Sequence, residues 1–125
     1  MQCTRALDIL ILLIDVMRIW DLEPRKLCRN HLLGEHRELH ALWSILVNGK
    51  KGYSKHPETL RWKGKLKALY NRHEKIVREM EKRGYLHKTP LDSKLATDAC
   101  KQDNFVNTHQ EQIEILRKKC KDCKV

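Results

Sequence analysis

The sequence has little proline and glycine, with 3 and 5 of these residues among 125. A turn-rich β fold needs more of both, so their shortage favours helices. The chain also lacks an apolar run near the roughly 20 residues that cross a bilayer. Its apolar stretch ILILLI, residues 9–14, is short and lies between Asp8 and Asp15. No internal repeat is visible, and the length suits one small domain with a single core.

Residues 1–16 also lack a strongly basic start and a small-residue cleavage site, which argues against a secretory signal peptide. Three interpretations of this leader stay open on composition. It is an accessory helix or strand, a removable pro-segment, or a set of upstream codons wrongly included in the reading frame.

Cysteine is scarce, odd in number and uneven in distribution, with five residues in all. That pattern argues against a secreted disulfide framework and for a reducing cytoplasm. Near the C-terminus, Cys120 and Cys123 form a C-x-x-C motif, with Cys100 and His109 upstream. Four such ligands could close a tetrahedral zinc site. A single C-x-x-C also fits free thiols, so we assign no metal and no cofactor from the sequence.

Positive charge is abundant: 26 Lys and Arg face 16 Asp and Glu, for a net charge of +10. A small basic domain commonly binds phosphate backbones. An anionic protein, a membrane surface or a merely solvated basic face are the alternatives. The basic tract after residue 49, interrupted by Tyr53 and Trp62, suits phosphate contact and base stacking. Its members are Lys50, Lys51, Lys55, Arg61, Lys63, Lys65 and Lys67. Alternatively, Trp62 belongs to the core and the lysines only aid solubility.

Hydrophobic periodicity predicts three main helices. The first opens at Glu23-Pro24 and runs to about Val47, before Asn48-Gly49. Its stripe comprises Leu27, Cys28, His31, Leu32, Glu35, Leu39, Leu42, Trp43 and Leu46. A basic loop at 48–58 and a short helical segment at 58–63 precede the second long helix, which stops at Arg83-Gly84. Trp20 and Trp43 are expected in the core.

Residues 85–107 look irregular, and a third helix is expected after them. Thr108 and Glu111 have the spacing of a capping box, and the Lys-rich end suits a helix C-terminus. We therefore predict an all-α fold: a compact single domain of three main helices with irregular connections.

Polar side chains share a face of the first predicted helix. His31, Glu35 and Glu38 lie at positions i, i+4 and i+7, beside the apolar stripe. Two carboxylates and an imidazole there are costly unless they are paired or used. Arg29 and Arg37 are near enough in sequence to pair with them, so an ordinary salt-bridged helix edge is the alternative to a functional site.

The segments MRIWDL (17–22), NHLLGEHREL (30–39) and VNGKK (47–51) resemble the phage-type pyrimidine-dimer DNA glycosylases, a family also called endonuclease V. The helix KALYNRHEKIVREMEKRGY (67–85) is similar to the long helix of that family. The resemblance covers residues 17 to about 92, and the H-L-x-x-E-x-R-E-L pattern is its most specific part. The aromatic-rich C-terminal segment of the phage enzyme has no counterpart here.

The resemblance implies a mainly α-helical enzyme that acts without a metal on double-stranded DNA containing ultraviolet-damaged pyrimidines. In that family the N-terminal α-amine attacks the sugar C1′, an imine forms, and β-elimination breaks the strand. The motif assigns the nucleophile to Met17 and the catalytic carboxylate to Glu38. It also assigns supporting or DNA-binding roles to further residues. These are Arg18, His31, Glu35, Arg37, Lys50 and Lys51.

An α-amine suits this chemistry because its reference pKa is about 7.7–8.0, against about 10.4 for lysine. Residues 1–16 would turn the Met17 nitrogen into an amide, which cannot form an imine. Met also stands where the phage enzyme has a small hydroxyl residue. We therefore expect the leader to be a start-site artefact and the working domain to span residues 17–125.

The expected protein is thus a cytoplasmic, DNA-associated, monomeric repair glycosylase with abasic-site lyase activity and no membrane partner. The alternatives are a non-catalytic basic nucleic-acid-binding module, stabilised by zinc, and an interaction protein that docks through its apolar leader. Neither alternative needs a free terminus or Glu38.

Overall fold

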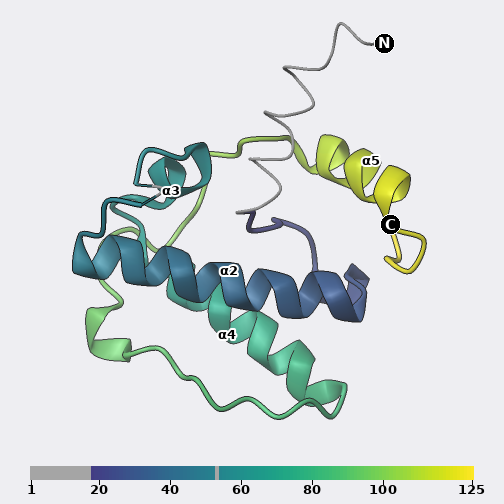
Figure 1. Cartoon of the computed structure of the whole chain (residues 1–125), viewed down its shortest axis with the longest axis horizontal. Helices are drawn as coiled ribbons and strands as arrows, with labels where there is room; N and C mark the ends of the chain where they lie inside the picture. The colour runs from purple at the N-terminus through teal and green to yellow at the C-terminus, as the bar shows by residue number, and fades with distance from the viewer. Residues whose placement is uncertain (1–17, 53) are drawn as a thin grey trace, which may run out of the picture.

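The computed structural model describes residues 18–52 and 54–125, and that part of the chain is helical without strands (Figure 1). The all-α prediction is therefore confirmed. The elements in chain order are η2 (Pro24–Lys26), α2 (Arg29–Asn48), α3 (Pro57–Trp62), α4 (Leu66–Lys82), η3 (Ser93–Leu95) and α5 (His109–Lys119). Helices α2, α4 and α5 correspond to the three main helices expected from the sequence, and α3 corresponds to the expected short helical segment.

The first long helix begins later than the sequence predicts. Pro24 opens only a 3-10 turn, Leu27 is extended, and α2 starts after Cys28. The break occurs because the Cys28 side chain caps the new helix by accepting a hydrogen bond from the His31 N–H. At its other end α2 stops at Gly49, whose φ of 65° lies in the left-handed region that glycine adopts at little cost.

The later boundaries agree closely with the sequence signals. Helix α4 ends at Lys82, just before Gly84, whose φ is 82°. Helix α5 follows the capping box: Thr108 accepts from the Glu111 N–H, and Glu111 accepts from the Thr108 N–H. Residues 85–107 are irregular apart from η3.

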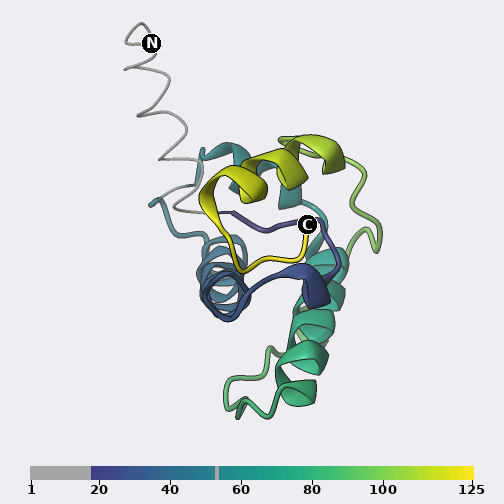
Figure 2. The same cartoon turned by 90° about the vertical axis from the view of Figure 1, so that its right-hand side faces the viewer.

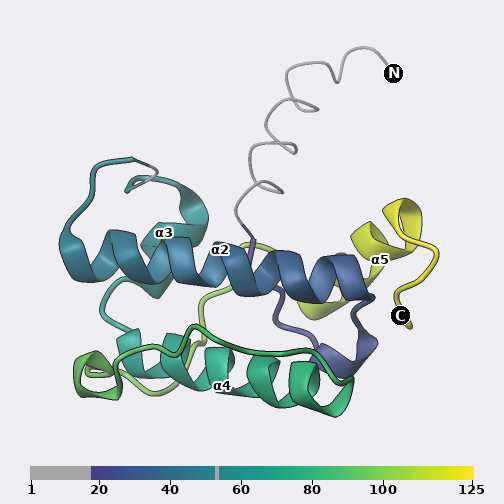
Figure 3. The same ribbon diagram turned by 60° about the horizontal axis from the view of Figure 1, so that its bottom comes forward.

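The core lies where α2 packs against α4, with the irregular segment after α4 running alongside the pair (Figure 3). Helix α5 and the C-terminal residues lie over the start of the described chain and the start of α2 (Figure 2). The fully buried apolar side chains include Ile19, Leu27, Leu32, Leu39, Leu42, Leu69, Ile76 and Leu116. Trp20 and Trp43 are also buried, as predicted.

Within the residues that the structure describes, no helix is both long and apolar enough to cross a membrane.

Candidate active site

The segment at residues 18–22 has no regular secondary structure, so its backbone groups need partners from elsewhere. The Trp20 N–H donates to Glu35 Oε1 at 3.2 Å, and the Asp21 N–H donates to Gln112 Oε1 at 2.8 Å. The Gln112 amide in turn donates to the Asp21 carboxylate at 3.0 Å. Side chains of α2 and α5 thus hold this segment in place.

Two arginines hold the carbonyls of the same segment. Arg61 donates to the Ile19 carbonyl at 2.9 Å, and Arg72 donates to the Leu22 carbonyl at 2.8 Å. Arg61 is buried and pairs with Glu58 at 2.6 Å. Because a buried charge is costly without partners, these contacts fix the path of the chain just after residue 17.

A pocket of about 150 Å³ opens beside this segment and the first turns of α2. Its lining residues are Arg18, Trp20, Asn30, His31, Gly34, Glu35, Glu38 and Lys119. Four of the residues that the sequence analysis selected therefore share one pocket: Arg18, His31, Glu35 and Glu38. Lys119, at the end of α5, is a member that the sequence did not indicate, because it lies 81 residues after Glu38.

The two carboxylates of the pocket differ in their surroundings. Glu35 is 2% exposed and receives two hydrogen bonds from the Arg72 guanidinium, at 2.7 and 3.1 Å. Burial raises its pKa, and Arg72 opposes that rise. Glu38 is half-buried; burial raises its pKa too, and only the neighbouring Arg37 opposes this. Glu35 is thus committed to a structural pair, whereas Glu38 is available for chemistry.

The cations selected from the sequence lie in three places: Arg18 before α2, Arg37 near its middle, and Lys50 and Lys51 after its end. The Arg18 guanidinium lies 4.7 Å from the centre of the Trp20 ring and donates to Asn107 at 2.7 Å. Arg37 is exposed. Lys50 and Lys51 are exposed after the end of α2, remote in sequence from the Glu38 pocket.

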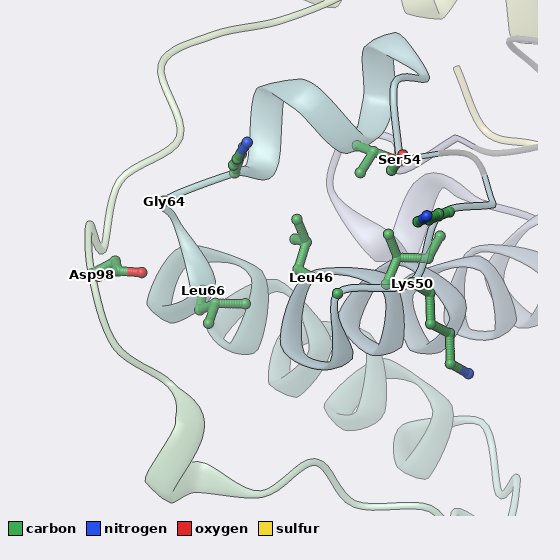
Figure 4. Close-up of a pocket in the computed structure, with 11 residues that line it drawn as sticks. Leu46, Lys50, Ser54, Gly64, Leu66 and Asp98 are labelled. Carbon is green, nitrogen blue, oxygen red and sulfur yellow. The ribbon is translucent and has the colours of Figure 1, made fainter.

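A second pocket, of about 310 Å³, lies between the end of α2, the loop around Ser54 and the start of α4 (Figure 4). Lys50, Lys51 and Lys63 line it, together with the carboxylate of Asp98. Only part of the basic tract predicted from the sequence is exposed at the surface. Arg61 is 3% exposed and Trp62 is 2% exposed, with the indole N–H donating to Glu58 at 2.9 Å. Neither side chain is available at the surface, because both are buried and bonded to the Glu58 carboxylate.

The cysteine set suggested by the sequence does not assemble. Cys100 is exposed and lines another pocket with His109. The sulfurs of Cys120 and Cys123 instead lie beside Cys28 and His31 at the start of α2. The spacing C-x-x-H at 28–31, which parallels C-x-x-C at 120–123, is the signal that could have found this set. A separate group of four histidines, His36, His40, His73 and His87, is also brought together.

Residues 1–17, which comprise the leader and the predicted nucleophile Met17, and also Tyr53 lie outside the described residues, and the first described residue is Arg18.

The fold and the site define a small, basic, all-helical protein with a carboxylate pocket at the start of its described chain. The chain belongs to the pyrimidine dimer DNA glycosylase family, whose model matches residues 17–93. That is the stretch over which the sequence resemblance extends. No curated protein and no solved structure gives a significant match to the chain. Damaged DNA is accordingly the substrate class of the family.

Proposed function

We propose that this protein excises ultraviolet pyrimidine dimers and cleaves the resulting abasic sites, with the α-amine of Met17 as nucleophile. The observation that carries the proposal is that Arg18, the next residue, lines the same pocket as Glu38. In a chain that begins at Met17, the α-amine would belong to the residue directly before this arginine. The working domain is then residues 17–125.

The reaction divides into two bond-breaking stages. The amine lone pair forms a bond to C1′ while the glycosidic bond breaks, and the departing base takes up a proton. The nitrogen loses one proton after its attack; the C1′–O4′ bond then opens, O4′ takes up a proton, and the nitrogen and C1′ are left joined by a protonated imine. Loss of a C2′ proton moves electrons toward the imine and expels the 3′ phosphate by β-elimination.

Glu38 is the group proposed to serve this chemistry. As an anion it stabilises the cationic sugar, and burial raises the pKa of this carboxyl above its ordinary value, which makes it a better proton acceptor. Arg37 keeps the carboxylate from neutralising entirely. Glu35 acts through the backbone: it holds Trp20 and, with Arg72, the segment that carries the nucleophile.

DNA binding is assigned to the basic surface, with Lys50 and Lys51 as phosphate contacts at the lysine-lined pocket. The damaged nucleotide must leave the stack to reach a carboxylate in a pocket. Arg18 and Lys119, which line the Glu38 pocket, supply positive charge for its phosphates.

Borohydride trapping on DNA that contains a pyrimidine dimer tests the imine. A chain beginning at Met17 should form a covalent adduct, whereas the same chain acetylated at its terminus should not. The 125-residue chain should be inactive unless residues 1–16 are removed, which intact-mass measurement reports. Absence of an adduct from the chain beginning at Met17 would overturn the proposal.

One observation favours a second candidate, a zinc-stabilised DNA-binding module without catalysis: the Cys28, His31, Cys120 and Cys123 cluster. Such a module would bind damaged and intact DNA alike and give no adduct. The trapping experiment therefore separates the two candidates.

A further inference from the structure

Four potential metal ligands converge from the two ends of the described chain: Cys28, His31, Cys120 and Cys123. Cys28 Sγ lies 3.6 Å from Cys120 Sγ and 3.1 Å from His31 Nδ1, and Cys123 Sγ lies 3.6 Å from His31 Nδ1. All four ligand atoms lie within 4.8 Å of one another. The resemblance assigns a supporting role to His31 alone among the four, and the two C-terminal cysteines lie beyond residue 93, where the family match ends.

These separations are those of a zinc tetrahedron. With Zn–S near 2.3 Å and Zn–N near 2.0–2.1 Å, neighbouring ligands stand about 3.8 Å apart for two sulfurs and about 3.6 Å for sulfur and nitrogen. A disulfide would need about 2.05 Å between sulfurs. We propose that Cys28, His31, Cys120 and Cys123 bind one structural Zn²⁺ ion.

Backbone N–H groups point at two of the sulfurs. The Cys28 N–H donates to Cys123 Sγ at 3.2 Å, and the His31 N–H donates to Cys28 Sγ at 3.4 Å. Cys28 is also the N-cap residue of α2. Such hydrogen bonds to the ligands orient a metal site and tune it. Four protein ligands leave no open position, so the ion is structural rather than catalytic.

The site ties the C-terminal tail to the pocket of Glu38. The Lys124 N–H donates to the Lys26 carbonyl at 2.7 Å, which adds a backbone link beside the cluster. Just before Cys120, Lys119 Nζ lies 5.6 Å from the centre of the Trp20 ring and lines the pocket. Zinc would thus fix one wall of the candidate active site, whichever reaction that site performs.

Metal analysis of the purified full chain tests this proposal by a measurement other than activity. Cys120→Ser and Cys123→Ser should each lose one equivalent of zinc, while Cys100→Ser, the matched exposed cysteine, should keep it. Cobalt substitution should give sulfur-to-cobalt charge-transfer absorption that both cluster variants lose.

Thiol alkylation with peptide mapping covers the case in which a variant does not fold. In the unaltered protein Cys28, Cys120 and Cys123 should be protected until a chelator is added, whereas Cys100 should react at once. Immediate reaction of all four in folded protein with excess zinc would overturn the site. Loss of zinc from Cys100→Ser would do the same.

A second cluster is carried by a different observation: buried imidazole nitrogens without partners. His36 Nε2 and His87 Nε2 are buried and have no hydrogen-bond partner. They face His40 and His73, whose Nε2 atoms lie 3.2 Å apart, and all four ligand atoms lie within 4.8 Å of one another. A buried polar atom without a partner costs about 1–3 kcal/mol, so four converging imidazoles need an explanation.

A divalent transition metal supplies that explanation. Metal–nitrogen bonds near 2.0–2.1 Å place tetrahedral nitrogens about 3.3–3.4 Å apart, close to the His40–His73 separation. The other nitrogen of His73 lies 2.7 Å from the Glu74 carboxylate, an arrangement that orients a metal-binding imidazole. We infer that His36, His40, His73 and His87 bind a second ion, between α2, α4 and the segment after α4.

Cobalt spectroscopy separates this site from the first. His36→Ala and His87→Ala should each lose one metal equivalent while the sulfur-to-cobalt absorption stays. His109→Ala, an exposed histidine outside both clusters, should retain both equivalents. Two bound metal ions in the double variant of His36 and His87 would overturn the histidine site. Binding of only the thiolate-held ion by the unaltered protein in excess zinc would also overturn it.

Discussion

Two glutamates three residues apart on α2 receive different environments from the same helix. Glu35 turns into the core, where Arg72 and the Trp20 N–H saturate its oxygens. Glu38, less than one turn later, remains half-buried at the pocket. The division follows from the helical repeat, because a step of three residues moves a side chain from the centre of the buried stripe to its edge.

Glu38→Gln should abolish base excision while leaving DNA binding intact, because the amide keeps the shape but carries no charge and accepts no proton. The expected loss in single-turnover rate is about 10²–10⁴-fold. Quench-flow measurement on dimer-containing DNA, with binding followed separately, checks this. Glu81→Gln, the same change at an exposed position of α4, should have no effect. Near-normal turnover in Glu38→Gln would remove the residue from its proposed role.

At the scale of single elements, α2 contains a glycine whose environment does not require one. No heavy atom lies within 4 Å of the position where a Cβ on Gly34 would stand. A glycine inside a helix costs roughly 0.5–1 kcal/mol relative to alanine. Gly34 lines the Glu38 pocket, so a side chain at this position would project into it.

Gly34→Ala should therefore stabilise the protein by about 0.5–1 kcal/mol and weaken catalysis by narrowing the pocket. Urea unfolding measures the first effect, and steady-state kinetics on damaged DNA measures the second. Unchanged kinetics would show that the substrate does not approach this turn of α2.

Helix α5 depends on its capping box. Thr108→Ala should lower the free energy of unfolding by about 1 kcal/mol, because it removes the acceptor for the Glu111 N–H. Thr108→Ser should behave nearly like the unaltered protein. Urea unfolding at neutral pH measures both variants, and equal stability of all three proteins would contradict the role of the cap.

The other half of the box depends on pH. The Thr108 N–H holds the pKa of Glu111 below its usual 4.5. Because the folded-state pKa is the lower one, this contribution is complete above pH 4.5 and is lost as pH falls through the folded-state value. Glu111→Gln should remove that part of the acid dependence, as urea titrations at stepped pH would show.

Local signals predicted most of these elements, and long-range contacts explain what they missed. The α4 stripe, its glycine stop and the capping box each act within a few residues, so the sequence suffices. The late start of α2 depends on Cys28, whose partners lie 92 and 95 residues away. Arg61 reads as part of a basic tract, but it is buried and donates to the carbonyls of Ile19 and Asn104, which lie 42 and 43 residues away. Periodicity carries no information about such pairings.

At the scale of the whole molecule, the net charge of +10 predicts salt-sensitive DNA binding. Each phosphate neutralised contributes about −0.9 to the slope of log K against log salt. Replacing Lys50 and Lys51 together by glutamine should therefore flatten that slope by about 1–2. Fluorescence anisotropy across a salt series measures it. Lys82→Gln, outside the lysine-lined pocket, serves as the control, and an equal slope in the double variant would exclude these lysines as phosphate contacts.

The contact between the start of α2 and the tail also orders events during synthesis. Cys120 leaves the ribosome 92 residues after Cys28, a delay of roughly 5–20 s at usual elongation rates. Helices α2 and α4 are both available well before that moment and can pack first. The nascent protein thus spends several seconds without the wall of the candidate pocket that Lys119 provides, and docking of residues 119–124 then adds it to an already packed core.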